Sequence, residues 1–157
     1  MTALRFVSEV PAPAAQVWAH ATSFEGINAD LWPLVRMTAP RELRGIGLEQ
    51  VVLGERLCRS WLLLFGVIPI EYDDLVVAEL EPGRRFLERS RMLTASVWQH
   101  ERVVTPVDAS SCTVTDHVSF LPRSALLRPV LGLVVPVVFR HRHRRLVSHF
   151  AARDAAR

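Results

Sequence analysis

The sequence predicts an α+β domain, built from a curved antiparallel sheet of about seven strands and one long C-terminal helix. Many short segments rich in β-branched and aromatic residues lie between residues 34 and 121, and turn sequences separate them. Helix-forming segments flank this region, two short ones before it and a long one after it. Consecutive strands with short connections pair as an antiparallel meander, and helices at the chain ends make the fold α+β.

The first part of the chain predicts a strand followed by two short helices. Residues 4–10 alternate apolar and polar side chains, as a half-buried strand does. Residues 14–21 are helix-forming, and Pro13 suits the first turn of that helix. Thr22 or Ser23 can cap a second helix with one apolar side. Both helices are short, so they need a surface to pack against.

The remaining strands are predicted between residues 34 and 121. Turn sequences such as residues 81–84, which contain Pro-Gly, separate them. The predicted strands are residues 34–38, 48–53, 57–65, 70–80, 84–92, 95–105 and 112–121.

The C-terminal segment is the element long enough to cover the apolar face of such a sheet. A helix over residues 129–152 would extend roughly 35 Å. Leu131, Val135 and Phe139 recur at helical spacing, so we expect the apolar part to face the sheet. The arginines that follow should mostly face water. Pro136 should kink this helix or split it in two.

Two other functions of this segment are excluded by its composition. The apolar run of residues 125–139 includes Arg128 and two prolines and falls short of the roughly 20 apolar residues that span a membrane. The basic cluster of residues 140–145 has no interleaved aromatic residues and no accompanying nucleic-acid motif. We therefore expect no stable membrane insertion and no nucleic-acid partner.

The composition is that of a folded domain. Half of the 157 residues are hydrophobic and 22% are charged, which excludes a disordered chain, and the length suits one domain over residues 1–157. Cys58 and Cys112 are too few for a disulfide framework and lack metal-ligand spacing. The N-terminus has no signal-peptide pattern. We expect a cytoplasmic protein, monomeric or homodimeric, with no metal and no cofactor.

Polar residues on apolar strand faces are the candidate functional residues. If the predicted strands 95–105 and 112–121 turn the same faces inward, their pairing brings His100 near Asp116. Such a pair could orient an imidazole for acid–base chemistry. The alternative is that Asp116 only satisfies Arg102 or His100 structurally, and both remain open.

A second polar group occurs near the start of the predicted strand 70–80. Alternation sends Tyr72 and Asp74 to one face, and Glu71 and Asp73 to the other. We take Tyr72 and Asp74 as candidates, although the sequence does not say which pair faces the interior. Glu88, within the predicted strand 84–92, is a third candidate that could point inward.

The order of elements and several segments resemble the START-like helix-grip superfamily (SRPBCC, Bet v 1-like). Residues 12–18 resemble the start of its first helix, and residues 80–86 its turn into a central strand. Residues 98–102 and 113–122 are similar to its last two strands. Residues 139–146 resemble the final helix of its bacterial polyketide cyclase/dehydrase-like, ligand-binding members. The resemblance covers essentially the whole chain.

This resemblance implies a helix-grip fold with a cavity between the sheet and the last helix, holding a hydrophobic small molecule such as a lipid or polyketide. Pockets of this kind have mostly apolar walls and a few polar groups that orient the ligand. The expected ligand-binding residues are Trp61, Tyr72, Asp74, Phe86, Glu88, Trp98, Arg102, Val118, Phe120, Leu131, Val135 and Phe139.

Passive binding is favoured over catalysis, because the sequence has no nucleophile motif, phosphate loop or metal-ligand spacing. The superfamily also contains cyclases and proteins with interaction roles, which remain alternatives. A cyclase or dehydratase needs a base and a donor that stabilises an enolate. His100 with Asp116 could be the base, and Arg102 or Tyr72 the donor.

Overall fold

Seven strands form one curved antiparallel sheet in the computed structural model, which describes residues 1–157. Their order across the sheet is β1-β7-β6-β5-β4-β3-β2, so β2 to β7 form a meander and β1 closes beside β7. The strands are β1 Thr2–Val10, β2 Val35–Met37, β3 Arg56–Leu64, β4 Ile68–Glu81, β5 Arg85–Met92, β6 Ala95–Pro106 and β7 Cys112–Pro122. The predicted α+β class and the antiparallel meander are confirmed.

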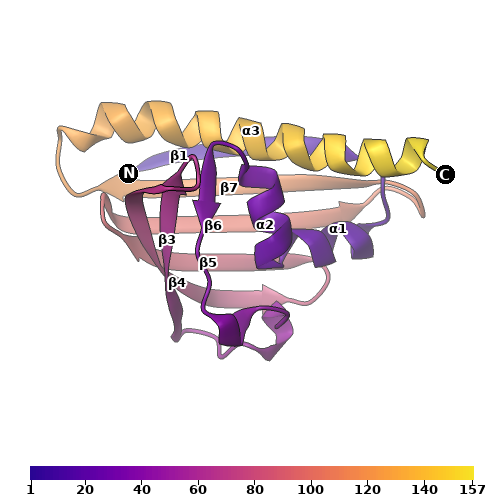
Figure 1. Ribbon diagram of the computed structural model, residues 1–157, viewed down its shortest axis with the longest axis horizontal. Helices are drawn as coiled ribbons and strands as arrows, with labels where there is room; N and C mark the ends of the chain where they lie inside the picture. Colours follow the sequence, from indigo (N-terminus) through magenta and orange to yellow (C-terminus); the bar gives the residue numbers. More distant parts are fainter.

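Three helices pack on this sheet (Figure 1). Helices α1 (Ala14–Ala21) and α2 (Phe24–Leu31) follow β1, and α3 (Leu127–Ala155) runs along the sheet. The Ser23 side chain accepts a hydrogen bond from the Gly26 backbone N–H and caps α2, as predicted for Thr22 or Ser23. The curled sheet, the two short helices after β1 and the long final helix make up the predicted helix-grip fold.

The prediction of a strand over residues 48–53 is wrong. Residues Leu48–Gln50 form a short 3₁₀ turn in the connection between β2 and β3, and no residue of this turn is buried. Gly45, at φ +81°, turns the chain just before it. Because β3 already pairs with β2 on one side and β4 on the other, residues 48–53 have no strand partner. Leu48 packs against the core, whereas Val52 and Leu53 are exposed, so the run belongs to a connection and not to the sheet.

The predicted split of the C-terminal helix at Pro136 is also wrong. Helix α3 continues through Pro136 from Leu127 to Ala155, and Figure 1 shows it unbroken. Proline removes the hydrogen bond to the carbonyl four residues earlier. That carbonyl belongs to Gly132, whose position is exposed, so water can satisfy it.

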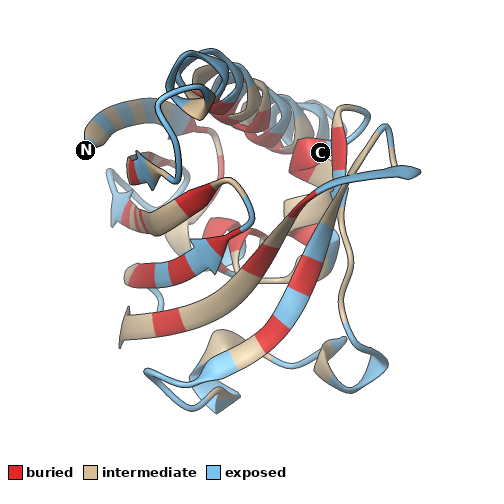
Figure 2. Ribbon diagram, turned by 90° about the vertical axis from the view of Figure 1, so that its left-hand side faces the viewer, coloured by how far each residue is buried: buried red, intermediate tan, exposed pale blue.

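Two apolar clusters join the helices to the sheet. The first gathers around Val17, Val104 and Leu146 and lies under the C-terminal part of α3. The second gathers around Phe120 and Phe139 and lies under the N-terminal part. Figure 2 shows the buried positions on the inner side of the strands and on the underside of α3. The core is thus divided between the two ends of the long helix.

Polar and charged residues make up an unusual share of the interior. Eleven of the 34 buried residues are polar or charged, and several carry full charges. They are Asp30, Ser60, Glu71, Asp73, Glu88, Ser90, His100, Arg102, Asp116, Arg142 and His143. Such groups are costly to bury without partners, so their arrangement indicates where the functional site lies. None of the helices is both long and apolar enough to span a bilayer.

Candidate ligand-binding site

Asp116 on β7 is the centre of the buried polar residues. Arg102 lies opposite it on β6 and donates through Nε to Oδ1 at 2.7 Å and through Nη2 to Oδ2 at 2.5 Å. His100 Nε2 lies 3.0 Å from Oδ1, and His143 Nε2, from α3, lies 2.9 Å from Oδ2. The other nitrogen of His143 contacts Ser8 on β1 at 2.8 Å. The expected contact between His100 and Asp116 is confirmed, and α3 is tied into it.

The environment of Asp116 keeps its carboxylate ionised. Complete burial opposes ionisation, but the Arg102 guanidinium and then His100 outweigh burial and hold the pKa of Asp116 well below its usual range. Four contacts from three side chains occupy both carboxylate oxygens. Asp116 is therefore suited to hold Arg102, His100 and His143 in place rather than to take a proton itself.

His100 continues the polar cluster toward β5. Its Nδ1 lies 3.6 Å from Glu88 Oε2, and Ser90 Oγ donates to Glu88 Oε1 at 2.8 Å. Burial, and next the charge of Glu88, raise the pKa of Asp73 well above its ordinary value. Burial also opposes ionisation of Glu88, but His100, Ser90 and Asp73 lower its pKa. Two neighbouring carboxyl groups thus have pKa values shifted in opposite directions.

A small cavity of about 70 Å³ lies beside Glu88 and His100. Most of its wall is apolar and comes from α2, β4 and β5, whereas α3 contributes Arg142. Its lining residues are Ala21, Thr22, Phe24, Ile27, Met37, Leu48, Leu75, Val77, Phe86, Glu88, His100 and Arg142. The cavity is thus apolar along its sides and polar at its inner end.

A larger open groove of about 750 Å³ adjoins this cavity. Helices α1 and α2, strand β2 and the connection to β3 form its walls. Thr22, Phe24 and Met37 border both hollows, so they separate the groove from the polar end of the cavity. The two hollows are therefore neighbours, with these three side chains between them.

Three predicted ligand-binding residues lie on the outer face of the sheet, which corrects their placement. Trp61 is 41% exposed and packs edge-on against Tyr72, and Arg59 bonds Asp74 at 2.8 Å on the same face. The strand alternation turns Glu71 and Asp73 inward instead, and both are buried. Of the two pairs left open by the sequence, Glu71 and Asp73 therefore face the interior. The sequence could not distinguish the two pairs, because the inner face of the sheet is the one on which α3 packs.

The other predicted residues lie inside but in two different settings. Phe86, Glu88 and His100 line the cavity, and Arg102 is fully buried beside Asp116. The remaining six pack against one another in the apolar cluster under the first half of α3 and do not line the cavity. They are Trp98, Val118, Phe120, Leu131, Val135 and Phe139. Four of these six are buried core residues, whereas Trp98 and Leu131 are partly buried and pack against that core. The role of all six toward a ligand stays a prediction.

Sequence reasoning missed two buried residues of α3, Arg142 and His143. Arg142 is 8% exposed and lines the cavity, and His143 is 5% exposed and contacts Asp116. A signal was present in the sequence, because Arg142 interrupts the apolar stripe of this helix between Phe139 and Leu146. A charged residue at a position that faces the core is itself a sign of function.

Comparisons with solved structures place the fold among START-like proteins. A START superfamily protein from Mycobacterium smegmatis matches with a TM-score of 0.67 at 10% identity, over 96% of this chain and 97% of that one. An aromatase/cyclase from a Streptomyces species matches at 0.64 and 16% identity, over 97% and 94% of the two chains. Norcoclaurine synthase from Thalictrum matches at 0.67 and 12% identity, over 98% and 96%. At such identities the likeness shows the shared fold.

Among curated proteins, none matches this chain in sequence. The family described as "Domain of unknown function (DUF8410)" matches residues 8–150, which is most of the chain. The chain therefore belongs to this DUF8410 family, and its fold is START-like.

Proposed function

We propose that this protein binds a hydrophobic small molecule, such as a lipid or polyketide, between the sheet, α2 and α3. One observation carries the proposal: an apolar-walled cavity with a polar inner end adjoins an open surface groove. Pockets that bind small molecules combine apolar walls with a few polar groups that orient the ligand. The START-like fold, shared with an aromatase/cyclase and with norcoclaurine synthase, supports the same proposal.

The volumes indicate how such a ligand would lie. The inner cavity of about 70 Å³ holds only a small group. The groove of about 750 Å³ is within the roughly 300–1,000 Å³ of typical ligand pockets. The bulk of the ligand would therefore occupy the groove, with one end passing Phe24 and Met37 to reach Glu88, His100 and Arg142.

Native mass spectrometry of the purified protein tests this proposal. The wild-type protein is expected to retain a co-purified apolar molecule. Leu75→Trp should lose it, because the indole would fill the inner cavity that Leu75 lines. Val7→Trp is the matched control, since Val7 is 48% exposed on the outer face of β1. Absence of a bound molecule from the wild type, or its retention by Leu75→Trp, would count against binding at this place.

A cyclase-type enzyme is the second candidate function, and the carboxyl pair favours it. Asp73 and Glu88 have pKa values shifted in opposite directions, and Glu88 lies beside His100 at the inner end of the cavity. Paired groups of this kind supply an acid and a base at one pH. Removal of a proton next to a ketone requires both a base and a donor to the enolate.

Hydrogen–deuterium exchange next to the carbonyl of 2-tetralone, followed by NMR, tests for this chemistry without knowledge of the natural substrate. The wild-type protein should accelerate the exchange, and Glu88→Gln should reduce the acceleration about 10²–10⁴-fold. Glu101→Gln is the control, because Glu101 lies on β6 outside the interior, where it pairs with Arg85 and His117. No acceleration by the wild type would exclude Glu88 as a base toward this ketone.

A further inference from the structure

Arg142 is a buried guanidinium on the underside of α3. Its residue is 8% exposed, it borders the inner cavity, and its Cζ lies 5.2 Å from the ring centroid of Phe139. It occupies the core-facing stripe of the helix, between Phe139 and Leu146. The packing of α3 on the sheet therefore holds the Arg142 side chain in the interior.

Unlike Arg102, Arg142 makes no hydrogen bond or ion pair with a carboxylate. Arg102 donates twice to Asp116, whereas Arg142 Nε is buried without a hydrogen-bond partner. Asp116, Asp30 and Glu88 act on Arg142 only through space. Burial, and next the charge of Arg102, lower the pKa of Arg142 to about 10. In the same interior, the guanidinium of Arg102 is thus paired with a carboxylate and that of Arg142 is not.

An unpaired buried charge is costly, and an apolar residue would fill this position without that cost. No hydrogen bond or ion pair joins Arg142 to the neighbouring carboxylates. Asp30 Oδ1 lies 2.9 Å from His20 Nε2, and Asp30 Oδ2 is itself buried without a partner. Asp116 is bonded by Arg102 and two histidines. Glu88 accepts from Ser90 and faces His100.

We propose that Arg142 binds the carboxylate of an apolar ligand whose body lies in the cavity and groove, which rests on the proposed binding function. A guanidinium presents parallel N–H groups that match a carboxylate in a bidentate pair. The inner cavity has room for a group of that size beside Arg142. Arg102 Nη1 is also buried without a partner, but Arg102 does not line the cavity, so Arg142 is the guanidinium that a ligand there would meet. The ligand class is thus a hydrophobic carboxylic acid, either an acyl chain or a ring system.

Two pairs of probes measure the contribution of the carboxylate to binding separately from that of the apolar body. The first is a dansylated undecanoic acid with its methyl ester, and the second is 2-naphthoate with 2-naphthamide, so that acyl and ring-shaped ligands are both covered. Binding is measured by fluorescence. The wild-type protein should bind the acid of at least one pair about 10–100-fold more tightly than its neutral counterpart, the range expected for charged hydrogen bonds.

Arg142→Met should lower the affinity for the acid to that for its neutral counterpart, because methionine keeps an apolar stem and lacks the charge. Arg142→Lys should keep part of the preference, since it keeps the charge and loses the fork. Arg140→Met is the matched control, because Arg140 is exposed on α3 two residues away. It should behave as the wild type.

The outcomes distinguish this inference from the binding function. Equal binding of acid and neutral probe by the wild type overturns the carboxylate site and leaves apolar binding standing. Binding of no probe overturns the proposed function, and the carboxylate site with it. The thermal midpoint gives a second measurement: Arg142→Met should keep or raise it, because an unpaired buried charge is removed. A lower midpoint would show that Arg142 supports the fold instead, which would also overturn the site.

Discussion

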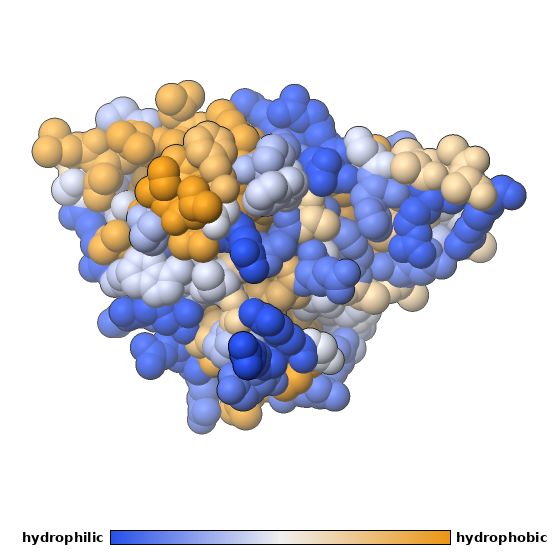
Figure 3. Space-filling model, in the orientation of Figure 1, coloured by the Kyte–Doolittle hydropathy of each residue, from blue (hydrophilic) through white to orange (hydrophobic).

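The two halves of α3 differ in hydropathy, but in each half some side chains lie where their hydropathy would not place them. In the apolar first half, Leu133 is 70% exposed and Val137 is 46% exposed. In the basic second half, Arg142 and His143 are buried. Figure 3 shows apolar residues gathered on the surface over the start of this helix. Hydropathy alone would assign the first half to the core and the second half to water.

The helical period explains the difference. Buried residues follow one another at spacings of three and four along one stripe, which consists of Val135, Phe139, Arg142, Leu146 and Phe150. His143 lies beside this stripe and is buried too. The expectation that the apolar part faces the sheet is correct for Val135 and Phe139. It is wrong for the second apolar stripe on the opposite face, which contains Val130, Leu133, Val134 and Val137.

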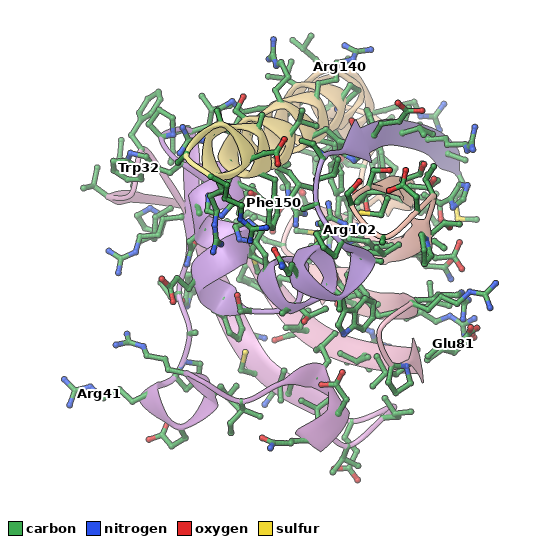
Figure 4. All side chains as sticks on the ribbon, turned by 90° about the vertical axis from the view of Figure 1, so that its right-hand side faces the viewer. Trp32, Arg41, Glu81, Arg102, Arg140 and Phe150 are labelled. Carbon is green, nitrogen blue, oxygen red and sulfur yellow. The ribbon has the colours of Figure 1, made fainter.

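The arginines follow the same rule. Arg140, Arg144 and Arg145 are exposed, as expected, and Arg142 is not. Figure 4 shows Arg140 on the outer side of α3 and Arg102 in the interior beneath the helix. Position on the helix, rather than local composition, decides which basic residues are buried. The second half of α3 therefore covers buried polar residues as well as an apolar cluster, and the first half covers an apolar cluster alone.

The largest expected effect tests the polar interior beneath the second half. Asp116→Asn should destabilise the fold by about 3–5 kcal/mol, because Arg102 would stay buried without its counter-charge. Asp74→Asn is a geometric match, since Arg59 bonds Asp74 through the same two nitrogens at 2.8 and 2.9 Å. That pair lies at the surface, so its loss should cost less than about 1 kcal/mol. Urea unfolding measures both, and similar costs would show that the interior pair is not special.

The next effect compares two adjacent valines in the first half. Val135 is 6% exposed and Val134 is 43% exposed. Val135→Ala should cost about 2 kcal/mol of unfolding free energy through lost burial and a cavity. Val134→Ala should change stability by less than about 0.5 kcal/mol, because the residue lies outside the core. The gain in helix propensity is the same in both variants, so the difference between them reports burial alone. Equal effects would contradict the two-stripe description of this helix.

A third prediction concerns the pH dependence that Asp73 adds. Its pKa is raised in the folded protein, so the folded state binds more protons than the unfolded state above an unfolded pKa near 3.9. Its contribution to stability is thus fully present below that pH and is lost as pH rises through the folded pKa. Within this window the loss approaches about 1.4 kcal/mol per pH unit.

Chemical unfolding between pH 4 and pH 8 measures this dependence. Asp73→Asn should flatten the fall in stability, because asparagine does not titrate. Asp74→Asn should leave the slope unchanged, since the Arg59 hydrogen bond lowers the pKa of Asp74 and moves its window to more acidic pH. If the free energy of unfolding of Asp73→Asn fell with pH as steeply as that of the wild type, the pKa of Asp73 would not be raised in the folded protein.

The smallest effect is expected at the exposed apolar stripe. Leu133→Gln should change the free energy of unfolding by no more than about 0.5 kcal/mol, because Leu133 is 70% exposed. Thermal unfolding compared with the wild type checks this value. A loss of more than about 2 kcal/mol would place Leu133 among the core residues of α3, against its exposure in the structure.

Much of the fold could be predicted from local patterns. The strand β7 was expected at residues 112–121 and occurs at Cys112–Pro122, because its alternation is regular. The contact of His100 with Asp116 followed from the pairing of consecutive strands, which leaves few possible registers. Residues 48–53 were mistaken for a strand because a short apolar run does not distinguish a strand from a partly exposed connection.

The candidate site was less predictable, because its residues come from distant parts of the chain. Strand alternation groups Glu71 with Asp73 and Tyr72 with Asp74, but the direction of each face depends on where α3 packs. His143 reaches Asp116 across 27 positions and the whole thickness between helix and sheet. Neither relation is a local property of the sequence.

The sequence by itself determined most of the strands and helices, because these follow from side-chain periodicity and turn residues over a few positions. It also determined the antiparallel order, through short connections. Only the tertiary structure decided which face of the sheet and which stripe of α3 meet, and hence that Arg142 lies unpaired at the end of a cavity. The physical reason is that burial is a property of the assembled layers, in which each side chain's cost depends on partners far away in sequence.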